Sequence, residues 1–129
     1  MNETVRQWVQ KAEDDYIVAR REAAADPSPS FDAACFHAQQ CIEKLMKAVL
    51  IARHVLAPRT HDLFELRRLI RTLFDWSWDD EELQMLTRAA IAYRYPTESA
   101  RPEDAANALD ICTRLRAELL QMIAAESTP

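Results

Sequence analysis

An arginine between two tyrosines is the feature of this sequence best suited to chemistry. The stretch AYRYPTES, residues 92–99, places Tyr93, Arg94 and Tyr95 directly before Pro96. An arginine offers a planar fork of donors that fits phosphate, and a tyrosine ring offers a flat face on which a base can stack. The structural alternative is that Tyr93 fills the core, Pro96 ends a helix and Arg94 pairs with an acid on a neighbouring helix. On residue types alone, this structural interpretation is the simpler one.

A second set of polar residues recurs at helical spacing. Steps of three, four and three residues separate His37, Gln40, Lys44 and Lys47, which places them on one face of a helix. This strip could bind an anion, but an ordinary surface or a set of interhelical hydrogen bonds is the simpler interpretation. His61, in the segment RTHDL, is a further candidate, although a general base also needs a positioned partner.

The composition excludes some nucleotide-binding devices. The 129 residues contain no glycine, so neither a P-loop nor a Rossmann phosphate turn can form. The net charge of −5 argues against a protein that coats nucleic acid through bulk charge. Residues 44–71 nevertheless hold seven Lys or Arg against two acids, a local charge of +5, so one region could face an anion.

The length indicates one domain, residues 1–129, that needs no disulfide or metal to hold it. No apolar run approaches the ~20 residues of a membrane span, and the N-terminus MNETVRQW has no apolar signal region. Cys35, Cys41 and Cys112 are an odd number without a C-x-x-C pair, and each lies in an apolar helical pattern, which predicts buried thiols. We therefore expect a cytoplasmic protein.

Apolar residues at 3-and-4 spacing predict the helices that must position these side chains. The first two are expected over residues 3–24 and about 31–53, separated by the connector DPSPS, with Ser30 or Asp32 as the cap of the second. No strand-like alternation of useful length occurs. The pattern predicts an all-α fold, an up-and-down antiparallel bundle of about five helices.

The three later helices are shorter or less regular in pattern. The third is expected over residues 63–73 with Thr60 as its N-cap. The fourth begins at the acids of DDEE, which complement the helix dipole, and runs through Tyr93. Pro102 suits the first position of the fifth. Between the third and fourth, Trp76 and Trp78 are expected to pin the joint by packing.

Three segments, in this order, resemble the HEPN family (higher eukaryotes and prokaryotes nucleotide-binding domain). They are FDAACFHAQQCIEKLMKAVL, RTHDLFEL and LTRAAIAYRYPTE, and the similarity extends from AEDDYIVA to about residue 120. The matching positions are Gln39, Gln40, Glu43, Lys44, Lys47, Ala48, Thr60, His61, Asp62, Leu63, Tyr93, Arg94, Tyr95 and Pro96. Each segment alone is weak evidence, but their combination is specific.

The resemblance implies a helical bundle that pairs into a homodimer, binds nucleotide or RNA, and is often encoded beside a minimal nucleotidyltransferase. Many family members are metal-independent ribonucleases with an arginine followed by four to six residues and a histidine. Arg94 matches that arginine, but Ser99, Ala100 and Arg101 occupy the positions of the histidine. None of the three exchanges protons well near neutral pH, so the sequence argues against RNA cleavage.

Three hypotheses account for these features. The preferred one is a binding module, a homodimer that holds a nucleotide, an RNA or a minimal nucleotidyltransferase partner in a toxin–antitoxin-like system. The second is a metal-independent ribonuclease toxin in which His37 or His61 replaces the missing histidine, and the third is a purely structural or interaction bundle. We expect no metal, no cofactor and no catalytic residue. The candidate ligand-binding residues are Arg94, Tyr95, His37, Gln40, Lys44, Lys47 and His61.

Overall fold

The fold is entirely helical over residues 1–126, the part of the chain that the computed structural model describes. The helices are α1 (Glu3–Ala24), α2 (Phe31–Ala52), α3 (Leu63–Arg71), α4 (Asp80–Ile91), the 3₁₀ turn η1 (Ala92–Arg94) and α5 (Pro102–Glu126). The prediction of an all-α protein with five helices is confirmed, and Pro102 takes the expected first position of α5.

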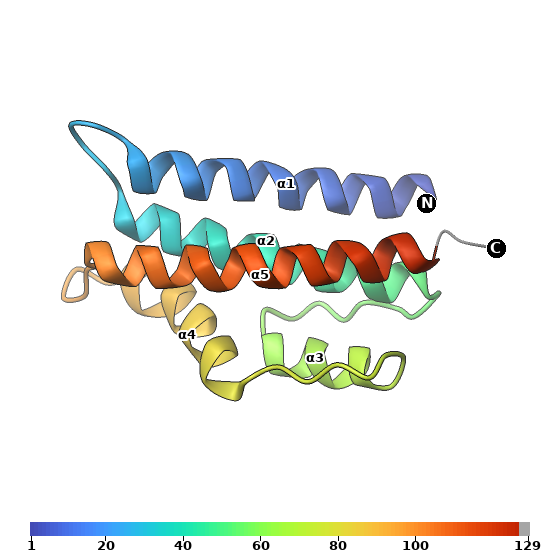
Figure 1. Cartoon of the computed structure of the whole chain (residues 1–129). Helices are drawn as coiled ribbons and strands as arrows, with labels where there is room; N and C mark the ends of the chain where they lie inside the picture. Colours follow the sequence, from blue (N-terminus) through green and yellow to red (C-terminus); the bar gives the residue numbers. More distant parts are fainter. Residues whose placement is uncertain (127–129) are drawn as a thin grey trace.

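Three long helices form the body of the molecule, and α2 is its centre (Figure 1). In Figure 1, α1 runs opposite to both α2 and α5, while the shorter α3 and α4 lie on the side of α2 away from α1. Helix α2 packs against each of the other four helices. Its apolar residues, including Ile42, Leu45 and Met46, are fully buried in one core with Leu115 and Leu119 of α5.

The ends of α2 follow local chemistry. Ser30 caps its start, as predicted, because the Ser30 hydroxyl accepts a hydrogen bond from the Ala33 amide at 3.3 Å. Beyond the other end, His54 has a φ of 61°. Glycine is the usual residue in this left-handed conformation after a helix, and a chain without glycine must use another residue there.

The predicted cap of α3 was wrong. Asp62 is the N-cap, because its Oδ1 accepts a hydrogen bond from the Phe64 amide at 3.0 Å. Thr60 lies two residues earlier, where its hydroxyl accepts a hydrogen bond from the Asp62 amide at 3.0 Å and shapes the entry to the helix. Both residue types cap helices well, so the pattern alone could not choose between them. The helix also ends at Arg71, before the predicted Leu73.

Helix α4 ends earlier than predicted, and this alters the setting of Arg94. Asp79 of the DDEE segment caps it through a 3.0 Å hydrogen bond from the Glu81 amide to Asp79 Oδ1. The α-helix stops at Ile91, and Tyr93 lies in η1 instead. Pro96 forces Tyr95 into extended backbone, and the last turn before it tightens into a 3₁₀ turn.

Trp76 and Trp78 lie at the joint between α3 and α4, as predicted, and they also fasten it to α5. Their rings meet edge to face with centroids 3.7 Å apart. The Trp76 indole nitrogen donates to Glu118 Oε2 at 3.2 Å, and the Trp78 indole nitrogen donates to the same oxygen. Arg67 and Arg71 donate to the backbone oxygens of Trp78 and Trp76. The joint is therefore held by both side chains and backbone.

The three cysteines are free and buried, which confirms the prediction from the apolar pattern. Burial raises the pKa of the Cys35 thiol to about 11. A hydrogen bond with Cys112, followed by burial, also raises the pKa of Cys41. In the described chain, no helix is both long and apolar enough to cross a bilayer.

Candidate functional site

Arg94 and His37 line the same hollow. This hollow has a volume of about 450 Å³ and lies between the first turns of α2 and the end of α4 with η1. The residues around it are Asp32, Ala33, Phe36, His37, Ala89, Ala90, Tyr93 and Arg94. Two residues that are 57 positions apart in the sequence are thus brought to one place, because α4 packs against α2.

Arg94 is exposed and stands over an aromatic ring. Its guanidinium carbon lies 5.4 Å from the centroid of the Phe36 ring, a cation–π geometry. The structure records no ion pair between Arg94 and a carboxylate within residues 1–126. The structural alternative for AYRYPTES therefore holds only in part: Tyr93 packs against the core and Pro96 follows the last turn, but Arg94 has no acid partner there.

His37 is held by a buried carboxylate of α1. Its Nδ1 lies 2.7 Å from Oδ1 of Asp15, and the second oxygen of Asp15 accepts from Lys44 Nζ at 2.6 Å. The His37 side chain is 30% exposed, whereas that of Asp15 is 10% exposed. With Nδ1 committed to Asp15, the other nitrogen, Nε2, is the one left for a ligand. An imidazole oriented by a carboxylate can bind an anion or exchange a proton.

The remaining residues of the strip on α2 lie in internal contacts. Gln40 donates to the side-chain oxygen of Gln39 at 2.8 Å. Lys47 is buried, donates to Glu43 at 3.2 Å and lies 5.7 Å from the centroid of the Trp8 ring. Of the four strip residues, only His37 therefore lines the hollow of Arg94. Lys44 and Lys47 contact Asp15 and Trp8 of α1, whereas Gln40 bonds within α2.

His61 belongs to a separate network. Its Nδ1 lies 3.1 and 3.2 Å from the two carboxylate oxygens of Glu43, which is 4% exposed, while the His61 side chain is 86% exposed. Glu43 also accepts hydrogen bonds from Gln39 and Lys47. His61 therefore does not line the hollow of Arg94. Tyr95 is exposed and does not line it either.

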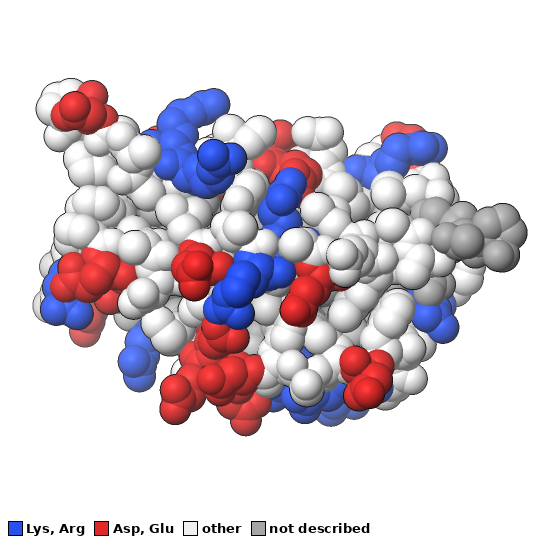
Figure 2. Space-filling view, viewed as in Figure 1, with Lys and Arg blue, Asp and Glu red and all other residues white. Residues whose placement is uncertain are grey.

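The basic segment over residues 44–71 does not form one cationic surface. Besides Lys44 and Lys47, the buried Arg67 pairs with Asp80 at 2.6 Å and Arg53 lies over the Phe74 ring. Figure 2 shows basic and acidic side chains side by side on one face, with acids gathered where α4 begins. Part of the local excess of positive charge is thus used inside the fold, whereas Arg59, Arg68 and Arg71 are exposed.

Sequence reasoning missed two contributors to the site, Phe36 and Asp15. Phe36 precedes His37 on α2 and was hidden by its ordinary apolar character. Asp15 could have been identified from the sequence, because it follows Ala12 by three residues and precedes Ala19 by four, on the buried stripe of α1. An acid on a buried stripe needs a partner on another helix. Within residues 1–126, no group of three or more His, Cys, Asp or Glu could hold a metal ion.

Comparisons with known proteins agree with this fold. The HEPN domain model matches residues 5–122. The solved structure of TT1696 from Thermus thermophilus superimposes with a TM-score of 0.76 and 25% identity, over 95% of this chain and 99% of that one. ST0689, an archaeal HEPN homologue, gives a TM-score of 0.66 and 24% identity over the same shares. No curated protein matches the chain. The chain belongs to the HEPN domain family.

Proposed function

We propose that the protein binds a nucleotide or RNA, with the hollow of Arg94 and His37 as the anion site. One observation carries this proposal: an exposed guanidinium, without a carboxylate partner in the described chain, lies over Phe36 in the hollow that His37 also lines. A guanidinium fork fits phosphate, and an imidazole can add a further donor. Membership of a family that is generally related to nucleotides and RNA supports the same assignment.

More specifically, we propose that the protein pairs with a minimal nucleotidyltransferase in a toxin–antitoxin-like system. This pairing rests on the resemblance to the family alone. Three free, buried cysteines suit the reducing cytoplasm in which such a pair would act. Co-expression of the protein with a minimal nucleotidyltransferase encoded beside it, followed by purification through one tagged partner, tests the pairing.

The binding proposal is tested by thermal melts with ATP, other nucleotides and short RNAs. A ligand at a hundred times its dissociation constant should stabilise the protein by about 2.7 kcal/mol. We expect Arg94→Ala to weaken binding roughly tenfold or more, because a hydrogen bond to a charged group contributes about 1.5–3 kcal/mol. Arg68→Ala is the matched control, since Arg68 is an exposed arginine of α3 that does not line the hollow. Normal binding by Arg94→Ala would place the site elsewhere.

A metal-independent ribonuclease is the second candidate, and the Asp15–His37 pair favours it. This pair brings an oriented imidazole to Arg94 from another helix, although the expected histidine at residues 99–101 is missing. The binding proposal predicts that purified protein leaves unstructured RNA intact in the presence of EDTA. Cleavage that is lost in both His37→Ala and Asp15→Asn, but kept in His61→Ala, would establish the ribonuclease instead.

A further inference from the structure

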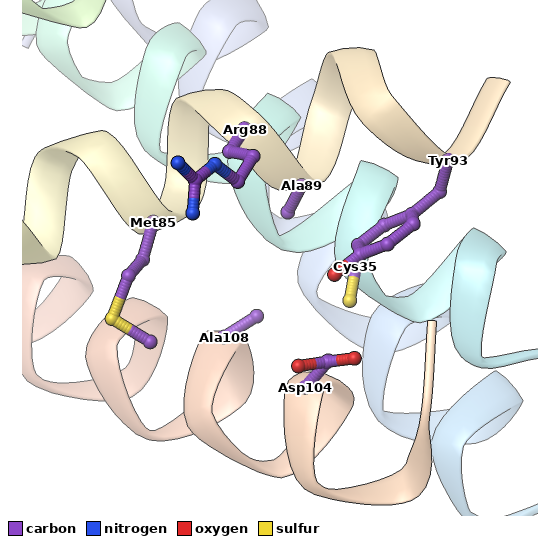
Figure 3. Close-up of a pocket in the computed structure, with 7 residues that line it drawn as sticks. All are labelled: Cys35, Met85, Arg88, Ala89, Tyr93, Asp104 and Ala108. Carbon is purple, nitrogen blue, oxygen red and sulfur yellow. The ribbon is translucent and has the colours of Figure 1, made fainter. Parts of the chain in front are cut away.

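A second, smaller hollow adjoins the hollow of Arg94. Its volume is about 110 Å³, and it lies between α2, α4 and α5 (Figure 3). The residues that line it are Cys35, Met85, Arg88, Ala89, Tyr93, Asp104 and Ala108. Tyr93 and Ala89 line both hollows, so these two residues form the wall between them.

The sizes of the two hollows suit different parts of one ligand. Pockets for whole small molecules typically measure about 300–1,000 Å³, a range that includes the hollow of Arg94 but not the smaller one. A space of about 110 Å³ with apolar side chains on it suits a flat group. A base in the small hollow would leave its sugar and phosphate to pass Tyr93 toward Arg94.

The small hollow carries one cationic and one anionic side chain that do not pair with each other. Arg88, from α4, is exposed and has no ion pair within the described chain. The Arg101 guanidinium lies 3.5 Å from Oδ2 of Asp104, on α5, and the same oxygen accepts a 2.8 Å hydrogen bond from the Arg101 amide. This bond is the main reason that the pKa of Asp104 is lowered, so the carboxylate stays ionised. Figure 3 shows Arg88 and Asp104 on different sides of the hollow.

We propose that this hollow binds a guanine base, with Arg88 and Asp104 reading its two polar edges. The inference rests on the proposed nucleotide or RNA binding and names the base that the site takes. Guanine presents two acceptors, O6 and N7, to which an arginine fork donates. Its N1–H and N2–H₂ groups are donors on the adjoining edge, which a carboxylate accepts. Adenine would instead point the lone pair of N1 at Asp104, so the same pair of side chains disfavours it.

Titrations of wild type with GMP and AMP test this assignment. We expect GMP to bind at least roughly tenfold more tightly than AMP, because the wrong base leaves a charged group without its hydrogen bond. Asp104→Asn should remove most of this preference. Its amide oxygen can still accept from the Arg101 amide, but its remaining polar group is a donor, which repels the N1–H and N2–H₂ edge. Glu103→Gln is the matched control, since Glu103 is the neighbouring acid and pairs with Arg101 outside the hollow.

The outcomes separate the two proposals. Arg94→Ala should weaken GMP and AMP by similar factors, because it acts on the phosphate they share. Equal binding of the two nucleotides by wild type, or a GMP preference that survives in Asp104→Asn, overturns the guanine assignment but leaves the anion site intact. Binding of neither nucleotide to wild type overturns the guanine assignment, whereas the anion site is overturned only if ATP and the short RNAs also fail to stabilise the protein. Circular dichroism of each variant checks that the helices are retained.

Discussion

Arg94 should matter more for binding than for stability. Its side chain is exposed, and the contact with Phe36 is a surface cation–π interaction of about 0.5–1 kcal/mol. We therefore expect Arg94→Ala to lower the free energy of unfolding by no more than about 1 kcal/mol while weakening the binding of the nucleotide. Arg94→Lys should restore binding only in part, because a point charge does not reproduce the fork. Urea unfolding and ligand titration on the same samples measure both effects, and a strongly destabilised Arg94→Ala would reveal a structural residue.

The thiol of Cys35 should make stability depend on alkaline pH. Burial raises its pKa from 9.0 to about 11 in the folded protein, so the thiol ionises first in the unfolded chain. The contribution of the protonated Cys35 thiol to the free energy of unfolding is therefore fully present below pH 9. It is lost as pH rises toward 11, by up to about 2–3 kcal/mol. Urea unfolding of wild type and Cys35→Ala between about pH 8 and 11 isolates this effect. Parallel pH profiles of the two proteins would contradict it.

At the scale of elements, the joint between α3 and α4 depends on one carboxylate of α5. Glu118→Ala removes the acceptor of both indole N–H groups. The N–H of the buried Trp76 is then left without a partner, which should lower the free energy of unfolding by about 1–3 kcal/mol. Glu118→Gln keeps an acceptor and should cost less. Gln121→Ala, an exposed change on the same helix, is the control. Urea unfolding followed by tryptophan fluorescence measures the three variants, and a wild-type midpoint for Glu118→Ala would show that packing alone holds the joint.

The segment that follows this joint illustrates how an element positions a site. Asp79 starts α4, and Pro96 stops its continuation beyond η1, so both ends of this segment are set by local sequence. Its placement against α2 comes from buried residues such as Leu83 and Leu86. Arg94 thereby reaches the hollow near the start of α2. A substitution at either end of the segment would therefore displace Arg94, although Arg94 itself is unchanged.

At the scale of the whole molecule, we expect a homodimer. Ile91 and Tyr95 are large apolar residues close together near the end of α4, and their exposed fractions are 55% and 61%. Such residues often mark an interface, and a closed twofold pair is the commonest oligomer. Light scattering should give twice the 14.9 kDa mass of the chain at micromolar concentration. Ile91→Lys should shift the mass toward the monomer, whereas Leu56→Lys, in a separate loop, should not; a monomeric wild type refutes the expectation.

The sequence by itself determined the helices and what they bury. The apolar spacing predicted α1 and α2 almost to the residue, and the same spacing placed Cys35, Cys41 and Cys112 inside the core. These features depend on residues that are close along the chain, since periodicity reports which face of a helix is apolar. The cap of α3 and the end of α4 were less predictable, because several neighbouring residues could serve equally well.

Only the tertiary structure decided which polar residues share a site. Spacing placed His37 and Lys44 on one face of α2, but it could not show that Asp15 of α1 holds both. The sequence likewise allowed Arg94 to bind either a phosphate or an acidic side chain of another helix. In the structure η1 packs over α2, and Arg94 has no carboxylate partner in the described chain. The physical reason is that hydrogen bonds and charges act over a few ångströms between elements, whereas spacing describes one element at a time.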